Sequence, residues 1–169
     1  MARYILILLC LAVSLMCTAR SIEKRYSSYI SEKGTIYFFR PKKLAKNTNI
    51  GKFNFDMTYV SHKDSVIVNC SVNIKNSEKV SHLELKSGDK TIPGDAVYII
   101  FRNVIKNGYV VRVSSRFLLK DIEECFSNSN PLIFHIMSTD GQEYEATYTS
   151  SQWKEESEQV TRILNSINY

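Results

Sequence analysis

The strongest constraint on the fold is a regular alternation of apolar and polar residues between Phe53 and Ile74. Apolar side chains occupy every second position from Phe53 to Tyr59, and after a polar turn at 61–65 the same period continues from Val66 to Ile74. A period of two is the pattern of a strand with one buried face. Two such strands joined by a short polar segment predict an antiparallel hairpin whose second face, rich in Asn and Ser, meets water.

Six further segments have the composition of strands, and two pairs of them flank strong turn signals. Asn107-Gly108 and Asp140-Gly141 are expected to supply the left-handed dihedrals of two-residue hairpin turns. These predicted strands, in chain order, are Ile36–Phe39, Val80–Lys86, Ala96–Ile105, Tyr109–Ser115, Pro131–Met137 and Gln142–Thr149. Together with the hairpin they make about eight strands, linked mostly to their sequence neighbours, which favours antiparallel layers.

Two segments have helical periodicity. Apolar residues recur at helical spacing over 118–126, opposite charged residues, and Ser115 is available as a cap. A second apolar stripe runs from Trp153 to Ile167, with Ser150 or Ser151 as its cap. Each helix therefore has one face to bury against a sheet. The sequence predicts a mainly β (α+β) fold: an antiparallel β-sandwich or curved sheet of about eight strands, with one short inserted helix and a C-terminal helix packed on the sheet.

The first nineteen residues have the form of a signal peptide. An apolar run from Ile5 to Met16 follows one positive charge, and small residues at Cys17 and Ala19 suit cleavage at that point. The run is shorter than the roughly 20 residues of a membrane span. We therefore expect residues 1–19 to be removed and the mature protein to be exported, to the periplasm or outside the cell, with no transmembrane span. Lipidation at Cys17 and retention as an uncleaved anchor are the alternatives.

Charge divides the rest of the chain. Residues 20–34 are polar without an apolar period and are expected to form an exposed basic lead-in, followed by a single mainly β domain over 35–169. Residues 20–52 contain nine Lys or Arg against two Glu, whereas twelve basic and fifteen acidic residues follow. Such a segment can contact an anionic surface, or it can be only a solvated arm. The candidate contact residues are Lys24, Arg25, Arg40, Lys42, Lys43 and Lys46.

Two cysteines remain after the predicted cleavage, Cys70 and Cys125. An even pair in an exported chain permits one disulfide. Both residues also occupy predicted core-facing positions, where a free cysteine packs as a small apolar side chain. The sequence therefore leaves two alternatives open, a disulfide between these residues or two buried thiols.

No catalytic residue, cofactor site or metal site is predicted. His62, His82 and His135 have no second ligand at the spacing of a local metal site. The two core-facing cysteines are poor nucleophiles, because burial favours the protonated thiol. The six glycines are scattered, so no phosphate-binding loop is present in the sequence.

These observations favour a non-enzymatic exported binding or accessory domain. The alternatives are an enzyme of unfamiliar type and a structural or secretion-associated subunit that pairs with a partner through a sheet edge. The expected partner is an anionic surface or another protein. Nucleic acid is not an expected partner, because no recognition motif accompanies the basic residues and export removes the usual target.

Overall fold

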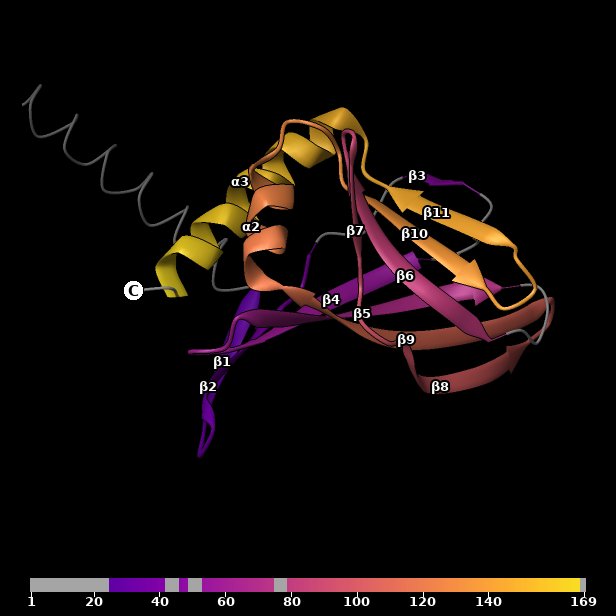
Figure 1. Cartoon of the computed structure of the whole chain (residues 1–169), viewed down its shortest axis with the longest axis horizontal. Coiled ribbons are helices and arrows are strands. Elements are labelled where there is room, and N and C mark those ends of the chain that lie inside the picture. The colour runs from indigo at the N-terminus through magenta and orange to yellow at the C-terminus, as the bar shows by residue number, and fades with distance from the viewer. Residues whose placement is uncertain (1–24, 42–45, 49–52, 75–78, 168–169) are drawn as a thin grey trace, which may run out of the picture.

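The computed structural model describes residues 25–41, 46–48, 53–74 and 79–167, and it arranges them as two antiparallel sheets with two helices (Figure 1). The fold class expected from the sequence is confirmed. The predicted signal peptide and Lys24 lie outside the described residues, as do Lys42 and Lys43. None of the helices in the described part of the chain is long and apolar enough to cross a membrane.

The larger sheet has six strands in the order β1-β2-β4-β5-β9-β8. At its centre lies the hairpin predicted from the alternation, β4 and β5, with Met57 opposite Val68. Their core-facing side chains are buried and the intervening ones are mostly half-buried, as a period of two requires. The six strands span Tyr26–Ser31 (β1), Gly34–Phe39 (β2), Phe53–Val60 (β4), Ser65–Ile74 (β5), Gly108–Leu118 (β9) and Tyr98–Ile105 (β8).

The smaller sheet has five strands in the order β3-β11-β10-β6-β7. Its central strand, β10, pairs with β11 on one side and with β6 on the other. A register shift beside Ser138 interrupts the β10–β6 ladder. The five strands span Lys46–Thr48 (β3), Glu143–Thr147 (β11), Ile133–Ser138 (β10), Val80–Ser87 (β6) and Lys90–Pro93 (β7).

Three strands were missed by the sequence analysis: β1, β3 and β7. Residues 26–31 were expected in an exposed lead-in, but they form β1 and pair with β2 from Tyr26 to Ser31. Most of β1 is exposed on both faces, so no apolar period marks it in the sequence. The strands β3 and β7 have three and four residues, too few for any period to be visible.

The turn prediction at Asn107-Gly108 is wrong by one residue. Ile105 pairs directly with Gly108, so Lys106 and Asn107 form the two-residue loop and Gly108 already belongs to β9. Gly108 has the positive φ, at 128°, because it closes the hairpin, whereas Asn107 keeps a negative φ. At the second predicted turn Gly141 has a φ of 81°, as expected, but Asp140 keeps a negative φ and four residues, 139–142, join the two strands in place of two.

The two predicted helices are present, but their caps differ from the prediction. Helix α2 (Leu119–Ser127) begins without a side-chain cap, and Ser115 lies inside β9, where its hydroxyl donates to the Asp95 carbonyl. Helix α3 (Ser150–Ile167) is capped by Thr149. Thr149 Oγ1 accepts from the Gln152 amide at 3.4 Å, and Gln152 Oε1 accepts from the Thr149 amide at 3.3 Å, a reciprocal capping box.

The core lies between the two sheets and beneath the helices. Phe134 of β10 packs on Phe53 and Phe55 of β4, at ring distances of 5.1 and 4.4 Å. The helices α2 and α3 lie side by side and cover the end of the larger sheet that the smaller sheet leaves open (Figure 1). The apolar stripe of α3 is buried there, namely Trp153, Val160, Ile163 and Leu164. The C-terminal helix is thus part of the core, as predicted.

A short crossing segment carries the chain from the smaller sheet to the larger one between β7 and β8. Gly94 donates its amide to the Leu83 carbonyl, and Asp95 donates to the Arg116 carbonyl, so the segment is fastened to both sheets. A Cβ on Gly94 would lie 2.8 Å from Phe117 Cζ and 2.9 Å from Leu83 O. Only glycine fits this crossing.

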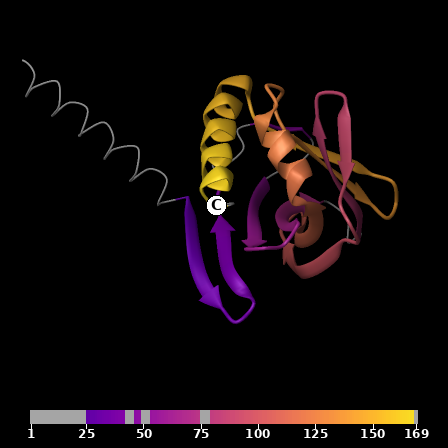
Figure 2. The same ribbon diagram turned by 60° about the vertical axis from the view of Figure 1, so that its left-hand side comes forward.

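A buried ion pair links the start of the described chain to its last helix. Arg25 Nη1 donates to Glu156 Oε2 of α3 at 2.7 Å, and Glu156 is only 1% exposed. The Arg25 carbonyl accepts from the Arg40 amide at 2.7 Å, which joins the two strands of the β1–β2 hairpin at this end. Figure 2 shows the hairpin, the outermost two strands at this side of the larger sheet, extending from beneath the end of α3.

Candidate functional site

The basic residues expected to contact an anionic surface have different surroundings. Arg25 is buried and its charge is engaged by Glu156, so it is not available to an external anion. Arg40 is exposed immediately after β2. Lys46 belongs to β3, at the edge of the smaller sheet. Contact with an anionic surface remains a prediction that rests on the sequence.

Cys70 and Cys125 are free thiols in the core. Their exposed fractions are 0% and 1%. Burial raises the pKa of the Cys125 thiol to about 11 and raises the pKa of Cys70 as well, which keeps both groups protonated at neutral pH. Of the two alternatives left open by the sequence, the structure has the buried thiols and no disulfide. Neither group is a nucleophile under these conditions.

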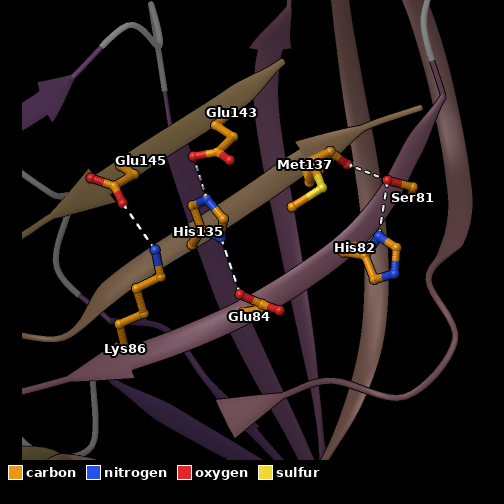
Figure 3. Close-up of polar contacts among 8 residues, drawn as sticks. All are labelled: Ser81, His82, Glu84, Lys86, His135, Met137, Glu143 and Glu145. Carbon is orange, nitrogen blue, oxygen red and sulfur yellow. Dashed lines mark hydrogen bonds and ion pairs between the residues drawn. The ribbon is translucent and has the colours of Figure 1, made fainter. Parts of the chain in front are cut away.

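The most organised polar cluster lies on the outer face of the smaller sheet, around His135 of β10 (Figure 3). His135 Nδ1 is 3.2 Å from Glu84 Oε2 of β6, and its Nε2 is 3.2 Å from Glu143 Oε2 of β11. The ring is only 4% exposed although it lies on an outer face. Beside it, Lys86 Nζ donates to Glu145 Oε1 at 3.3 Å.

The geometry of this cluster suits a structural role. The two glutamates face opposite nitrogens of the ring, so the three groups do not converge on one point, and no group of three ligands able to hold a metal exists among the described residues. A neutral imidazole has one N–H, so both contacts are hydrogen bonds only in the imidazolium form. The cluster fastens β10 to its two neighbours.

A serine and a histidine also meet on β6, without the geometry of a catalytic pair. Ser81 Oγ donates to the carbonyls of Met137 and Ser138, at 3.0 and 3.2 Å. His82 Nδ1 lies 3.0 Å from the same oxygen. Two backbone carbonyls thus compete with the ring nitrogen for the single hydroxyl proton of Ser81, which is not the arrangement of an activated serine nucleophile.

The His135 cluster cannot be recognised in the sequence, because its members are distant in the chain. Glu84 is 51 residues from His135, and Glu143 is eight residues away. The alternation around residue 135 places the histidine on the outer face, which the sequence does show. Its partners become visible only when the strand neighbours and their register are known.

The most unusual surface is the edge strand β8 of the larger sheet. All eight of its residues are exposed, including Tyr98 at 68%, Ile100 at 52% and Val104 at 79%. In Figure 1, β8 lies along the outer side of β9, away from β10 and β11. Edge strands are usually short or carry charge or proline. The opposite situation holds here, because β8 is long and its only charged residue is Arg102.

A separate hollow opens on the outer face of the larger sheet. It has a volume of about 360 Å³ and is formed by β4, β5, β9 and the turn between β4 and β5. Its lining residues are Thr58, Val60, Lys63, Asp64, Ser65, Ile67 and Arg116. A second hollow of about 240 Å³ shares Ser65 and Arg116 with it.

No protein-family model, curated protein or solved structure matches this chain. Its class is therefore defined by its own architecture, a two-sheet antiparallel β domain with two helices, a buried core and one long apolar edge strand.

Proposed function

We propose that this protein is an exported binding domain that associates with a second copy of itself by pairing the β8 strands edge to edge. The observation that carries the proposal is the exposure of the whole of β8. Export rests on the signal-peptide form of residues 1–19.

Strand pairing is the binding mode that this edge supports. Among the described strands, β8 bonds to β9 alone, so its other side presents backbone N–H and C=O groups to a partner strand. A register shift between Ile99 and Phe101 leaves Ile100 outside the ladder, whereas Phe101 to Ile105 pair regularly with β9. The regular part of the strand is the template for the partner, and the apolar side chains of β8 would contact those of the partner strand beside them.

A second copy is the occupant that best fits the edge. Two identical strands can pair antiparallel about a two-fold axis, which gives a closed dimer. Arg102 is the only charge on β8, so like charges face each other only if the axis passes through this residue. The exposed apolar side chains of β8 are Tyr98, Ile99, Ile100, Phe101, Val104 and Ile105. They would supply the apolar part of such an interface.

The test is the mass of residues 20–169 in solution, measured by sedimentation over a range of concentrations. We expect a reversible dimer. Val104→Lys should raise the dissociation constant at least about tenfold, because a lysine on an edge strand blocks pairing. The matched control is Ile30→Lys on β1, the opposite edge of the same sheet, where the parent side chain is 82% exposed. This variant should dimerise as the parent does.

Three results would overturn the proposal. The first is a parent that stays monomeric at high concentration, which would leave the edge to a different partner. The second is a dimer that Val104→Lys does not weaken. The third is an equal loss of association in Ile30→Lys, which would show that added charge anywhere on the sheet is sufficient.

A further inference from the structure

The hollow on the outer face of the larger sheet has features that β8 pairing does not explain. A row of side chains crosses its floor from β4 to β9, with Thr58 opposite Ile67 and Ile67 opposite Arg116. Lys63 and Asp64, from the turn between β4 and β5, form one wall. β8 does not cover this site, because its ladder with β9 ends at Ser114.

Arg116 differs from the other lysine and arginine side chains that the structure describes on the strands, because no hydrogen bond, ion pair or ring contact with another described residue engages it. The others have partners: Lys86 has Glu145, Lys90 has Asp121 and Glu124, Arg112 has Asp56, and Arg102 lies over the Tyr109 ring. Lys63, which also lines the hollow, likewise has no such partner among the described residues. Two unpaired cations therefore border one concave site.

The wall that presents Lys63 is held firmly by backbone hydrogen bonds. The Ser61 amide donates to the Thr35 carbonyl of β2 at 2.8 Å, and the Asp64 carbonyl accepts from the Leu119 amide at the start of α2 at 2.7 Å. His62, between them, has a φ of 65°, a conformation uncommon for a residue with a side chain. The site is therefore formed before any ligand arrives, which lowers the cost of binding.

The charge and polarity of the lining select one class of ligand. Lys63 and Arg116 contribute two positive charges and Asp64 one negative charge, so a monoanion suits the site better than a dianion. The planar guanidinium of arginine matches a carboxylate with two parallel hydrogen bonds. Val60 and Ile67 add an apolar floor, and the volume lies in the usual range for small-molecule sites.

We propose that this hollow binds a small organic acid, with Arg116 and Lys63 on its carboxylate and its apolar body on Ile67. This inference is independent of the β8 dimer. Occupancy of the hollow requires no second copy, and the dimer requires no ligand.

Benzoate is a suitable probe, titrated into residues 20–169 while the backbone amide signals of Ile67 and Arg116 are followed by NMR. We expect saturable shifts confined to the lining residues, with a dissociation constant in the millimolar range expected of a ligand this small. Benzamide has the same ring without the charge, and inorganic phosphate has charge without the ring. Both should bind at least about tenfold more weakly, because a hydrogen bond to a charged group and the apolar contact each contribute that much.

The critical variant is Arg116→Gln, and its matched control is Arg112→Gln. Both remove one positive charge from the same face of β9, but Arg112 pairs with Asp56 and does not line the hollow. Arg116→Gln should weaken benzoate binding at least about tenfold, and Arg112→Gln by less than about twofold. Amide spectra report whether each variant keeps the parent fold.

The proposal is overturned if benzoate gives no saturable shifts at the hollow, or if phosphate or benzamide binds as well as benzoate. It is also overturned if the two arginine variants lose binding equally while both remain folded, because that result would assign the effect to net charge. A loss of affinity in Lys63→Gln without a loss in Arg112→Gln would further support the site.

Discussion

The strands β5 and β8 belong to the same sheet and have similar apolar side chains, yet they have opposite relations to water. Alternate residues of β5 are buried to 1% exposure or less, from Val66 to Ile74. No residue of β8 is buried. The difference lies in their neighbours. β5 is flanked by β4 and β9 and lies over the core, whereas β9 is the one described strand beside β8.

This comparison shows that apolar composition does not determine where a strand lies in the fold. The aliphatic side chains of β5 stabilise the monomer because folding removes them from water. Those of β8 contribute little to the monomer and become useful only if a partner covers them. An edge strand of the smaller sheet, β7, follows the usual rule, since it has four residues, ends at Pro93 and pairs its Lys90 with carboxylates of α2.

The largest effect on stability is expected at Trp153 of α3. This residue lies outside both strands, but it is buried in the core as the inward residues of β5 are. Its ring lies 5.4 Å from Phe126 and 5.5 Å from Tyr148, and its Nε1 donates to the Asn128 carbonyl at 2.9 Å. Trp153→Ala should therefore lower the free energy of unfolding by about 3–5 kcal/mol, measured by urea denaturation. The exposed neighbour Lys154, changed to Ala, should alter it by less than about 0.5 kcal/mol. If Trp153→Ala leaves the free energy of unfolding unchanged, α3 does not contribute to the core.

A direct test of the comparison uses the same substitution in both strands. Ile74→Ala in β5 should cost about 2–5 kcal/mol of unfolding free energy, because it leaves a cavity in the core. Ile100→Ala in β8 should change that free energy by less than about 0.5 kcal/mol, because its side chain is already 52% exposed. Both values must be measured at concentrations where the protein is monomeric. Equal losses in the two variants would mean that β8 is covered within the monomer.

The smallest effect on stability is expected at the buried thiol of Cys125. Burial raises the pKa of Cys125 to about 11, above that of an unfolded thiol, so its neutral form stabilises the fold fully below about pH 8.5. This contribution should be lost as the pH rises through the folded pKa. We expect the free energy of unfolding to decline between about pH 9 and 11. The free energy of unfolding of Cys125→Ala should decline less steeply in this window. A slope identical to that of the parent would show that the Cys125 thiol does not cause the decline.

How far the sequence could predict this structure depends on burial. The β4–β5 hairpin and the stripe of α3 were predictable because each has one face in the core and therefore a clear period. The strand β1 was not, because both of its faces are largely exposed and no period arises. The cap of α3 was placed on Ser150 or Ser151 because serines are common caps, but the partner glutamine three residues after Thr149 distinguishes the correct one.

The candidate sites were less predictable than the fold for the same physical reason. The exposed edge and the hollow depend on which strands are neighbours, and a sequence period does not report neighbours. The run Ala96–Ile105 predicted a strand correctly, but its apolar content cannot distinguish an inner strand from an edge. Arg112 and Arg116 lie four residues apart on the same face of β9, so the sequence does not distinguish them. Their roles differ because Asp56 lies beside Arg112 and pairs with it.

The ion pair between Arg25 and Glu156 has a consequence for how the chain is made. Its two members are 131 residues apart, so the β1–β2 hairpin cannot be secured before most of the chain has left the ribosome. Contacts at such separation form late, because the intervening chain must be ordered first. This end of the fold should therefore close only after Glu156 has left the ribosome, so that the first and last parts of the described chain are joined as the final step of folding.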